Sequence, residues 1–229
     1  MLRGIGFVIA AIFATSVHAH FPWLTVDKEG QVSFFFGEDM TDCTYKLPEG
    51  IAKAEIMMTT GGETSKVETK TIETDDFLGM KSKGSVPADA HVMTSTTFGV
   101  YHGAKLQYYT QYLGGKMPTS FADCKPFKKL DLQAHAVDVE GGVDIYVLWK
   151  GKPLADAEVK LFCDRGHEEG NATTDAEGKV SFNDKEVEDG INGITVGYTI
   201  PGETGTFGDQ EYKSAMHYLT ATFYDPESK

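Results

Sequence analysis

The sequence lacks the short motifs that mark common catalytic centres. It has no Gly-x-Ser-x-Gly turn, no Cys-x-x-Cys, no His-Glu-x-x-His and no glycine-rich phosphate loop. Two pairs of adjacent carboxylates, Glu38-Asp39 and Asp75-Asp76, are poor acid–base partners, because neighbouring side chains on a strand point to opposite faces. We therefore predict no catalytic residue, and a binding role is favoured over an enzymatic one.

Long apolar runs are also missing, except for one near the start of the chain. Arg3, the apolar run over residues 5–17 and the sequence Val17-His18-Ala19 are typical of a signal peptide that is cleaved after Ala19. The run is too short to span a bilayer as a permanent helix, and no later run is longer. We predict a signal peptide over residues 1–19 and a periplasmic or secreted mature protein without membrane insertion.

Positive charge is scarce. Without Arg3, 20 basic residues remain against 34 acidic ones, which gives the mature chain a net charge of −14. Such an excess disfavours nucleic acid and anionic membrane surfaces as partners and is compatible with attracting cations. No nucleic-acid partner is predicted.

Cysteine is rare as well, with three in the chain. Cys163 alternates with Val159 and Leu161 on one face of an expected strand, which predicts a buried thiol. Cys43 and Cys124 lie in loop-like segments and could pair in an oxidising compartment. The sequence leaves their connectivity open.

Helical periodicity is absent, and short runs rich in Val, Thr and aromatic residues alternate with turn signals. This pattern predicts an all-β fold with strands over residues 21–26, 31–36, 54–60, 65–73, 77–83, 91–101, 105–113, 130–136, 143–149, 159–163, 194–199 and 216–224. Tight turns are expected at residues 61–62, at residues 102–104 and, within the stretch 173–182, at Asp175-Ala176-Glu177-Gly178. The turn-rich segment 114–129 marks the expected domain boundary. We predict two β-sandwich domains of Ig-like or Greek-key type, over residues 20–128 and 129–229.

Two stretches carry a resemblance to known families. Gly-Lys-Pro-Leu-Ala-Asp-Ala-Glu-Val at residues 151–159, followed by Thr-Thr-Asp-Ala-Glu-Gly-Lys-Val-Ser-Phe at 173–182, resembles the small Greek-key sandwich of carboxypeptidase-regulatory, transthyretin-like and pilin-type B domains. With Ala-His-Phe-Pro-Trp-Leu at 19–24 and Met-His-Tyr-Leu-Thr-Ala-Thr-Phe at 216–223, the whole mature chain is similar to the DUF4198 family of NikM-like, nickel-uptake-labelled periplasmic proteins. The resemblance implies export, a two-part β architecture, and a partnership with a membrane metal-uptake system.

Cleavage after Ala19 would make His20 the first residue of the mature protein. Its α-amine and ring Nδ1 could then chelate a transition-metal ion, after displacing a proton from an amine whose ordinary pKa is about 7.7–8.0. Copper has the highest intrinsic affinity for such nitrogens and nickel the next, and cobalt, nickel and copper are all candidates. Phe21, Trp23 and Leu24 would anchor this terminus to the sandwich.

Three further histidines are candidate metal ligands. His217 shares a strand face with three apolar residues, so it points inward, either as a core residue or as part of a cleft between domains. His102 lies at an expected hairpin tip, and His91 opens the same hairpin. His135 alternates onto the polar side of its strand and is predicted to lie at the surface. His167 lies in a polar, acidic loop expected over residues 164–170, which is solvated or binds a cation opportunistically.

Three functions remain open from the sequence. The first is an exported protein that binds nickel, cobalt or copper through His20 as an accessory to metal uptake. The second is a copper oxygenase in which His20 and another histidine form a histidine brace. The third is a structural or adhesive sandwich without metal.

Overall fold

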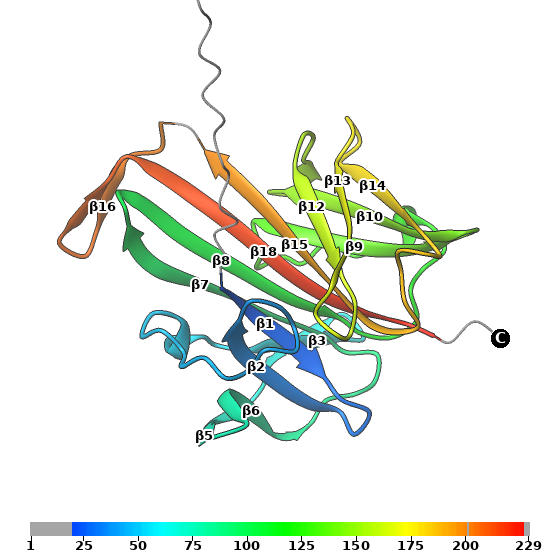
Figure 1. The fold of residues 1–229 in the computed structure, drawn as a ribbon, viewed down its shortest axis with the longest axis horizontal. Helices are drawn as coiled ribbons and strands as arrows, with labels where there is room; N and C mark the ends of the chain where they lie inside the picture. Colours follow the sequence, from blue (N-terminus) through cyan, green and yellow to red (C-terminus); the bar gives the residue numbers. More distant parts are fainter. Residues whose placement is uncertain (1–19, 201, 227–229) are drawn as a thin grey trace, which may run out of the picture.

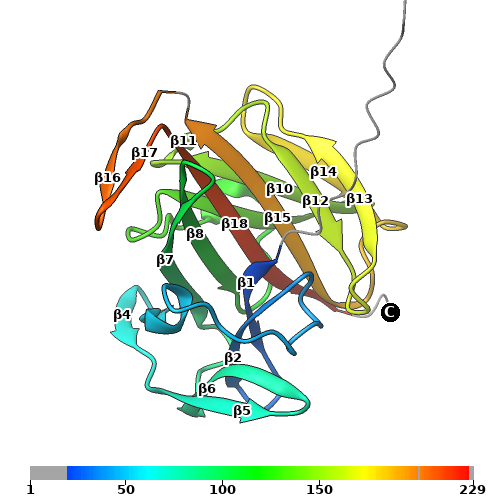
Figure 2. The ribbon, with the colours of Figure 1, turned by 60° about the vertical axis from the view of Figure 1, so that its left-hand side comes forward.

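The computed structural model describes residues 20–200 and 202–226, and the predicted signal peptide lies outside the described residues. The prediction of an all-β fold is confirmed, since the described part of the chain contains eighteen strands and only two short 3-10 helices, η1 (Ile51–Lys53) and η2 (Phe121–Asp123). The strands form four sheets, two of which pack on opposite faces of the largest one (Figures 1 and 2).

The largest sheet, called here the long sheet, has eight strands and runs diagonally through the centre of Figure 1. In spatial order its strands are β13 (Glu168–Thr173), β12 (Glu158–Phe162), β15 (Gly190–Ile200), β18 (Ser214–Asp225), β8 (Ala104–Leu113), β7 (His91–Tyr101), β3 (Met57–Thr60) and β4 (Glu63–Lys66). The last strand, β18, pairs with β8 in parallel and with β15 in antiparallel orientation. Strands from both sides of the predicted boundary thus share one sheet.

Three smaller sheets complete the fold. The N-terminal sheet has the order β1 (Phe21–Val26), β2 (Gln31–Gly37), β6 (Phe77–Ser85) and β5 (Thr69–Thr74). The β10 sheet is built on β10 (Gly142–Trp149), which pairs with β9 (Leu132–Val139), β11 (Lys152–Pro153) and β14 (Lys179–Asn183). The fourth is the hairpin of β16 (Gly205–Phe207) and β17 (Gln210–Tyr212).

Side-chain alternation along β8 and β18 creates two separate hydrophobic cores. Leu106 and Tyr108 of β8 belong to the core beneath the N-terminal sheet. Tyr109 of β8 belongs, with Leu219 and Phe223 of β18, to the core beneath the β10 sheet. Because successive residues of a strand face opposite sides, two adjacent strands supply both cores.

Most predicted strands are observed within a few residues of their expected ends, with three differences. The strand predicted over residues 65–73 is two strands in different sheets, because Val67 leaves the long sheet, is buried, and donates its N–H to the carbonyl of Ile56. The polar loop expected to extend to residue 170 ends earlier, where β13 begins at Glu168. The hairpin of β16 and β17 was not predicted.

The hairpin turns predicted at residues 61–62 and 102–104 are confirmed. Gly61 and Gly62 have φ of 57° and 87°, and His102 and Gly103 have φ of 49° and 79°. Two successive residues with positive φ form the two-residue turn that matches the twist of an antiparallel pair. His102 therefore lies in an exposed turn between β7 and β8.

Candidate functional site

His20 lies immediately before β1, in a half-buried position among aromatic rings. Its ring meets the Tyr45 ring edge-on, with the centroids 4.0 Å apart, and is stacked on Phe36 at 5.8 Å. The Nε2 atom lies 3.8 Å from a carboxylate oxygen of Glu38, and this buried nitrogen has no hydrogen-bond partner. The contacts with the two aromatic rings and with the carboxylate together fix the orientation of the imidazole ring.

The strand that follows His20, β1, is fixed to the long sheet by buried threonines. Thr220 donates its hydroxyl to the carbonyl of Pro22, and Thr222 donates to that of Leu24, both at 2.6 Å. Trp23 is fully buried and donates its indole N–H to the last residue of β2 at 3.3 Å. The residue immediately before this strand is therefore held next to a rigid element.

His217 lies on β18, and its predicted inward direction is confirmed, since only 6% of the residue is exposed. Its Nδ1 is 3.1 Å from the Tyr109 hydroxyl, and its ring meets Trp149 edge-on at 4.6 Å. Its Nε2 is buried without a hydrogen-bond partner, 3.9 Å from a carboxylate oxygen of Glu203. This nitrogen therefore has a carboxylate nearby but no hydrogen-bond partner.

The structure does not bring His20 and His217 together. β1 bonds to even-numbered residues of β18, whereas His217 is odd-numbered and faces the other side of the long sheet. His102 is exposed in its turn beside Tyr101, and His91 is half-buried against Phe127 at the other end of β7. Within the described residues, no group of three or more clustered His, Cys, Asp or Glu ligands includes any of these four histidines.

The clusters of possible ligands that do occur share Cys163, which is fully buried as predicted. Its sulfur lies within 4.8 Å of ligand atoms of His167 and Glu169, and equally of Asp164 and Glu188. Burial raises the pKa of the Cys163 thiol, which favours the protonated form over the thiolate that binds metal ions. The protonated sulfur makes this cluster a poor candidate for a metal site.

Cys43 and Cys124, which the sequence allowed to pair, are free thiols in the structure, as is Cys163. Cys43 donates its S–H to the carbonyl of Asp76 at 3.3 Å. Cys124 follows η2, in the segment between the β8 and β9 strands. The pairing that the sequence left open is therefore not formed in the described chain.

The prediction that His135 lies at the surface is wrong. Only 5% of the residue is exposed, and its ring is stacked on Phe127 at 5.5 Å and meets Phe121 at 5.9 Å. The segment that connects β8 to β9 folds over the outer face of β9, so the polar side of that strand is covered as well. Burial, aided by the nearby His91, lowers the pKa of His135 to about 4.

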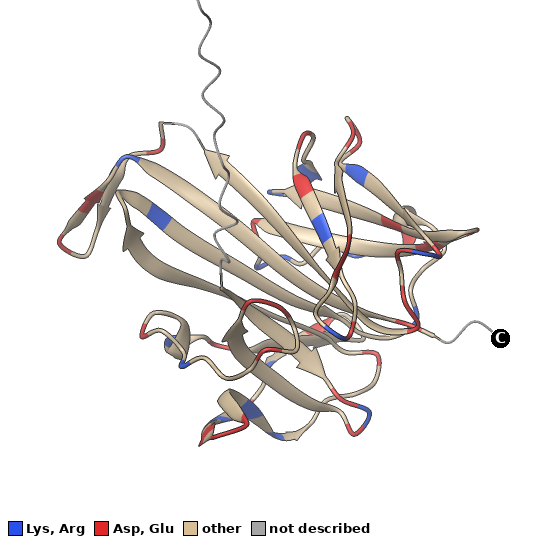
Figure 3. Cartoon of the chain, in the orientation of Figure 1, with Lys and Arg blue, Asp and Glu red and all other residues tan. Residues whose placement is uncertain are grey.

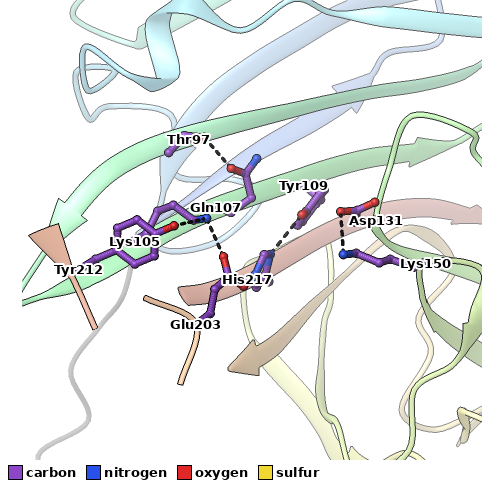
Figure 4. A network of polar contacts seen from close by, with 9 residues as sticks. All are labelled: Thr97, Lys105, Gln107, Tyr109, Asp131, Lys150, Glu203, Tyr212 and His217. Atoms are coloured by element: carbon purple, nitrogen blue, oxygen red, sulfur yellow. Dashed lines mark hydrogen bonds and ion pairs between the residues drawn. The ribbon is translucent and has the colours of Figure 1, made fainter. Parts of the chain in front are cut away.

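A cleft of about 370 Å³ opens beside His217 (Figure 4), and we call it the His217 cleft. It lies where β8, β10 and β18 meet the loop before β16. The residues that line it are Ser95, Lys105, Gln107, Tyr109, Lys129, Asp131, Trp149, Lys150, Glu203 and His217.

Two ion pairs lie in the His217 cleft. Lys105 contacts Glu203 at 2.8 Å and the Tyr212 hydroxyl at 3.3 Å (Figure 4), so the hydrogen bond to Lys105 lowers the pKa of Glu203. Lys150 lies 3.9 Å from Asp131. Burial lowers the pKa of His217, although Glu203 opposes this effect, and the imidazole is neutral at pH 7.

Sequence reasoning identified one residue of this cleft, His217, and missed the others. The parallel pairing of β18 with β8 aligns Tyr109 with Leu219 and brings Lys105 near His217, although their positions differ by more than 100 residues. Glu203 belongs to a loop that has no regular pattern. One signal could have found more of them. Tyr109, Trp149 and His217 each occupy an inward-facing strand position and carry a polar atom at the end of an aromatic side chain.

No protein-family model and no curated protein matches the chain. A search of the described residues found no helix with the length and apolar character needed to cross a membrane.

Proposed function

We propose that the mature protein is an exported metal-binding protein that captures a divalent transition-metal ion, namely nickel, cobalt or copper, through an N-terminal His20. The metal ion would be cargo for an uptake system, in line with the resemblance to DUF4198 proteins. The observation that carries the proposal is the placement of the His20 ring between two aromatic side chains with Nε2 turned to Glu38.

The donor set of His20 fits a transition-metal ion. A carboxylate near Nε2 favours the tautomer with the proton on that nitrogen, which leaves the lone pair of Nδ1 for a metal ion. Nδ1 and the α-amine belong to the same residue, so they can bind one ion together once Ala19 is removed. Glu38 would then act on the ring from the side opposite the metal, as carboxylates do for many metal-ligating histidines.

The surroundings of His20 reduce the cost of binding. The threonine bonds to β1 and the burial of Trp23 hold the start of the strand in place, so little ordering is left for the binding step. The net charge of −13 for the whole chain favours the approach of cations. In Figure 3, acidic residues gather in the loops, while the long strands carry little charge.

The histidine-brace oxygenase has no supporting observation. A brace needs a second histidine that binds the same ion. His217 belongs to β18, the strand on which β1 packs, but its side chain faces the opposite side of the long sheet. The rings that contact His20 are those of Tyr45 and Phe36. A binding role is therefore favoured.

Calorimetric titration of the mature protein with Ni²⁺, Co²⁺ and Cu²⁺ tests the proposal, after mass spectrometry confirms that His20 is the first residue. The comparison protein has its α-amine acetylated, because one or two added residues would create new chelates with their own amides. Acetylation should weaken binding at least about a hundredfold, and Glu38→Gln about tenfold or more. The proposal is wrong if acetylation leaves the affinity unchanged, and absence of binding in the mature protein would favour the structural sandwich.

A further inference from the structure

The nitrogen Nε2 of His217 is a polar atom that the fold buries without a partner. The residue is 94% buried and lines the His217 cleft, and Nε2 itself is buried. Burial raises the pKa of Tyr109, so its hydroxyl keeps its proton and can donate to Nδ1 at 3.1 Å. Nε2 then carries the ring proton and acts as a donor. An unpaired buried donor costs roughly 1–3 kcal/mol, so the site is built to receive an acceptor.

The nearest carboxylate does not satisfy this donor. Glu203 lies 3.9 Å away, too far for a hydrogen bond, and its other oxygen is bound to Lys105 at 2.8 Å. A hydroxyl oxygen that lies beside this pair, within hydrogen-bond distance of both atoms, could accept from His217 and donate to the carboxylate at the same time. The pair therefore fits the chemistry of an alcohol.

The charge of the cleft is opposite in sign to that of the whole protein. Three lysines and two carboxylates line it, whereas the chain has a net charge of −13. Lys105 is neutralised by Glu203, and one further carboxylate, Asp131, lines the cleft together with the exposed Lys129 and Lys150. An excess of cations in a locally concave surface attracts an anionic group.

The indole of Trp149 supplies the apolar wall. Its ring lies edge-on to His217, and the ammonium group of Lys150 sits 5.1 Å from its centroid. A volume of about 370 Å³ is at the small end of the range for small-molecule sites. A ligand of monosaccharide size can place its ring on the indole and a charged group near the lysine.

We infer that the His217 cleft binds a small hydroxycarboxylate of the sugar-acid class. Its carboxylate pairs with Lys129 and Lys150, a hydroxyl bridges His217 Nε2 and Glu203, and its carbon skeleton packs on Trp149. This site lies on the opposite face of the long sheet from His20 and does not depend on the metal-binding proposal.

Tryptophan fluorescence provides a direct test, because the chain has two tryptophans and Trp23 is fully buried. The metal-free mature protein is titrated with D-galacturonate, D-glucuronate and D-gluconate, with D-galactose as the neutral partner of the first. At least one acid should change the Trp149 emission, with half-saturation at about 1 mM, which corresponds to a binding free energy of about −4 kcal/mol. D-galactose should leave the emission unchanged. The indole N–H signals in NMR spectra assign the change to Trp149 or Trp23.

Variants locate the ligand. His217→Phe keeps an aromatic ring and removes both nitrogens, and Lys150→Met removes an exposed charge; each should weaken binding at least fivefold. Lys160→Met, at a half-buried lysine paired with Glu168 outside the cleft, should leave the binding unchanged. The inference is overturned if no acid binds below 20 mM (about 2.3 kcal/mol of binding free energy at that limit), if D-galactose binds as well as D-galacturonate, or if both cleft variants bind like the unmodified protein.

Discussion

The two faces of the strand pair formed by β8 and β18 make different sites from neighbouring residues. On one face, Tyr108 and Tyr218 pack against Phe21 of β1, and the N-terminal sheet closes the surface. On the other, Tyr109 and His217 border an open cleft. A shift of one residue along a strand therefore separates a covered face from a binding surface.

The faces also differ in how their polar groups are used. Toward β1, threonine hydroxyls bond to backbone carbonyls and fix the strand that follows His20. Toward the cleft, His217 keeps one nitrogen without a partner, and ion pairs form at the rim. Polar groups stabilise the fold on the first face and remain available to a ligand on the second.

The largest expected effect tests whether the two faces belong to one cooperative unit. Phe223→Ala should destabilise the core beneath the β10 sheet by about 3–5 kcal/mol, and Leu24→Ala that beneath the N-terminal sheet by about 2–5 kcal/mol. Because β8 and β18 serve both cores, we expect urea unfolding of each variant to remain a single transition at a lower midpoint. Two transitions, each shifted by only one variant, would instead support two domains over residues 20–128 and 129–229.

Acid should destabilise the side of the molecule that carries His135. The pKa of this buried imidazole is about 4, below the ordinary value of 6.5, so between these pH values the unfolded chain binds a proton that the folded chain does not. Stability should fall by about 3 kcal/mol as the pH drops from 6.5 to 4, since each pKa unit corresponds to about 1.4 kcal/mol. In urea melts across this range, His135→Phe should flatten the slope, and the exposed control His102→Asn should not.

Thr220→Val should affect metal binding at His20 without affecting ligand binding in the His217 cleft. The change leaves the buried carbonyl of Pro22 with only a long contact to Thr110, at 3.5 Å, and should cost about 1–2 kcal/mol. Metal affinity at His20 should fall, while the affinity of the His217 cleft should stay within twofold. Thr96→Val is the matched control, because its buried hydroxyl has no hydrogen-bond partner; equal losses in both variants would contradict this assignment.

The smallest effect is expected at the rim of the cleft. Asp131→Asn removes the exposed carboxylate near Lys150 and should change the free energy of unfolding by less than about 0.5 kcal/mol. It should strengthen D-galacturonate binding two- to threefold, because Lys150 loses a competitor. Weaker binding of the acid in this variant would show that Lys150 is not a cation for the ligand.

Local patterns in the sequence predict much of this fold. Alternation along residues 91–101 and 105–113 places the β7–β8 hairpin, and the same rule turns His217 inward. The rule failed at His135, because alternation shows which side of a strand is polar but not whether another segment covers that side. The glycine-rich turns were predictable because positive φ is a local requirement.

The cleft could not be predicted in the same way, because its geometry depends on pairings between distant segments. Lys105 and Glu203 are 98 positions apart and form an ion pair only because β18 lies beside β8. No periodicity in either segment encodes that choice of neighbour. His20 was identified through its expected position after cleavage, but its orientation toward Glu38 depends on how β1 pairs with β2.

The position of β18 has a consequence for how the chain reaches its native state. This strand is the last in the described sequence, yet it lies in the interior of the long sheet between β8 and β15. Until residues 214–225 arrive, β8 and β15 each have an unpaired edge that can recruit strands of other chains. The parallel pairing with β8 also joins segments about 110 positions apart, and such distant contacts slow folding. Completion of the sheet is therefore a late event, and a chain that ends before β18 should aggregate rather than fold.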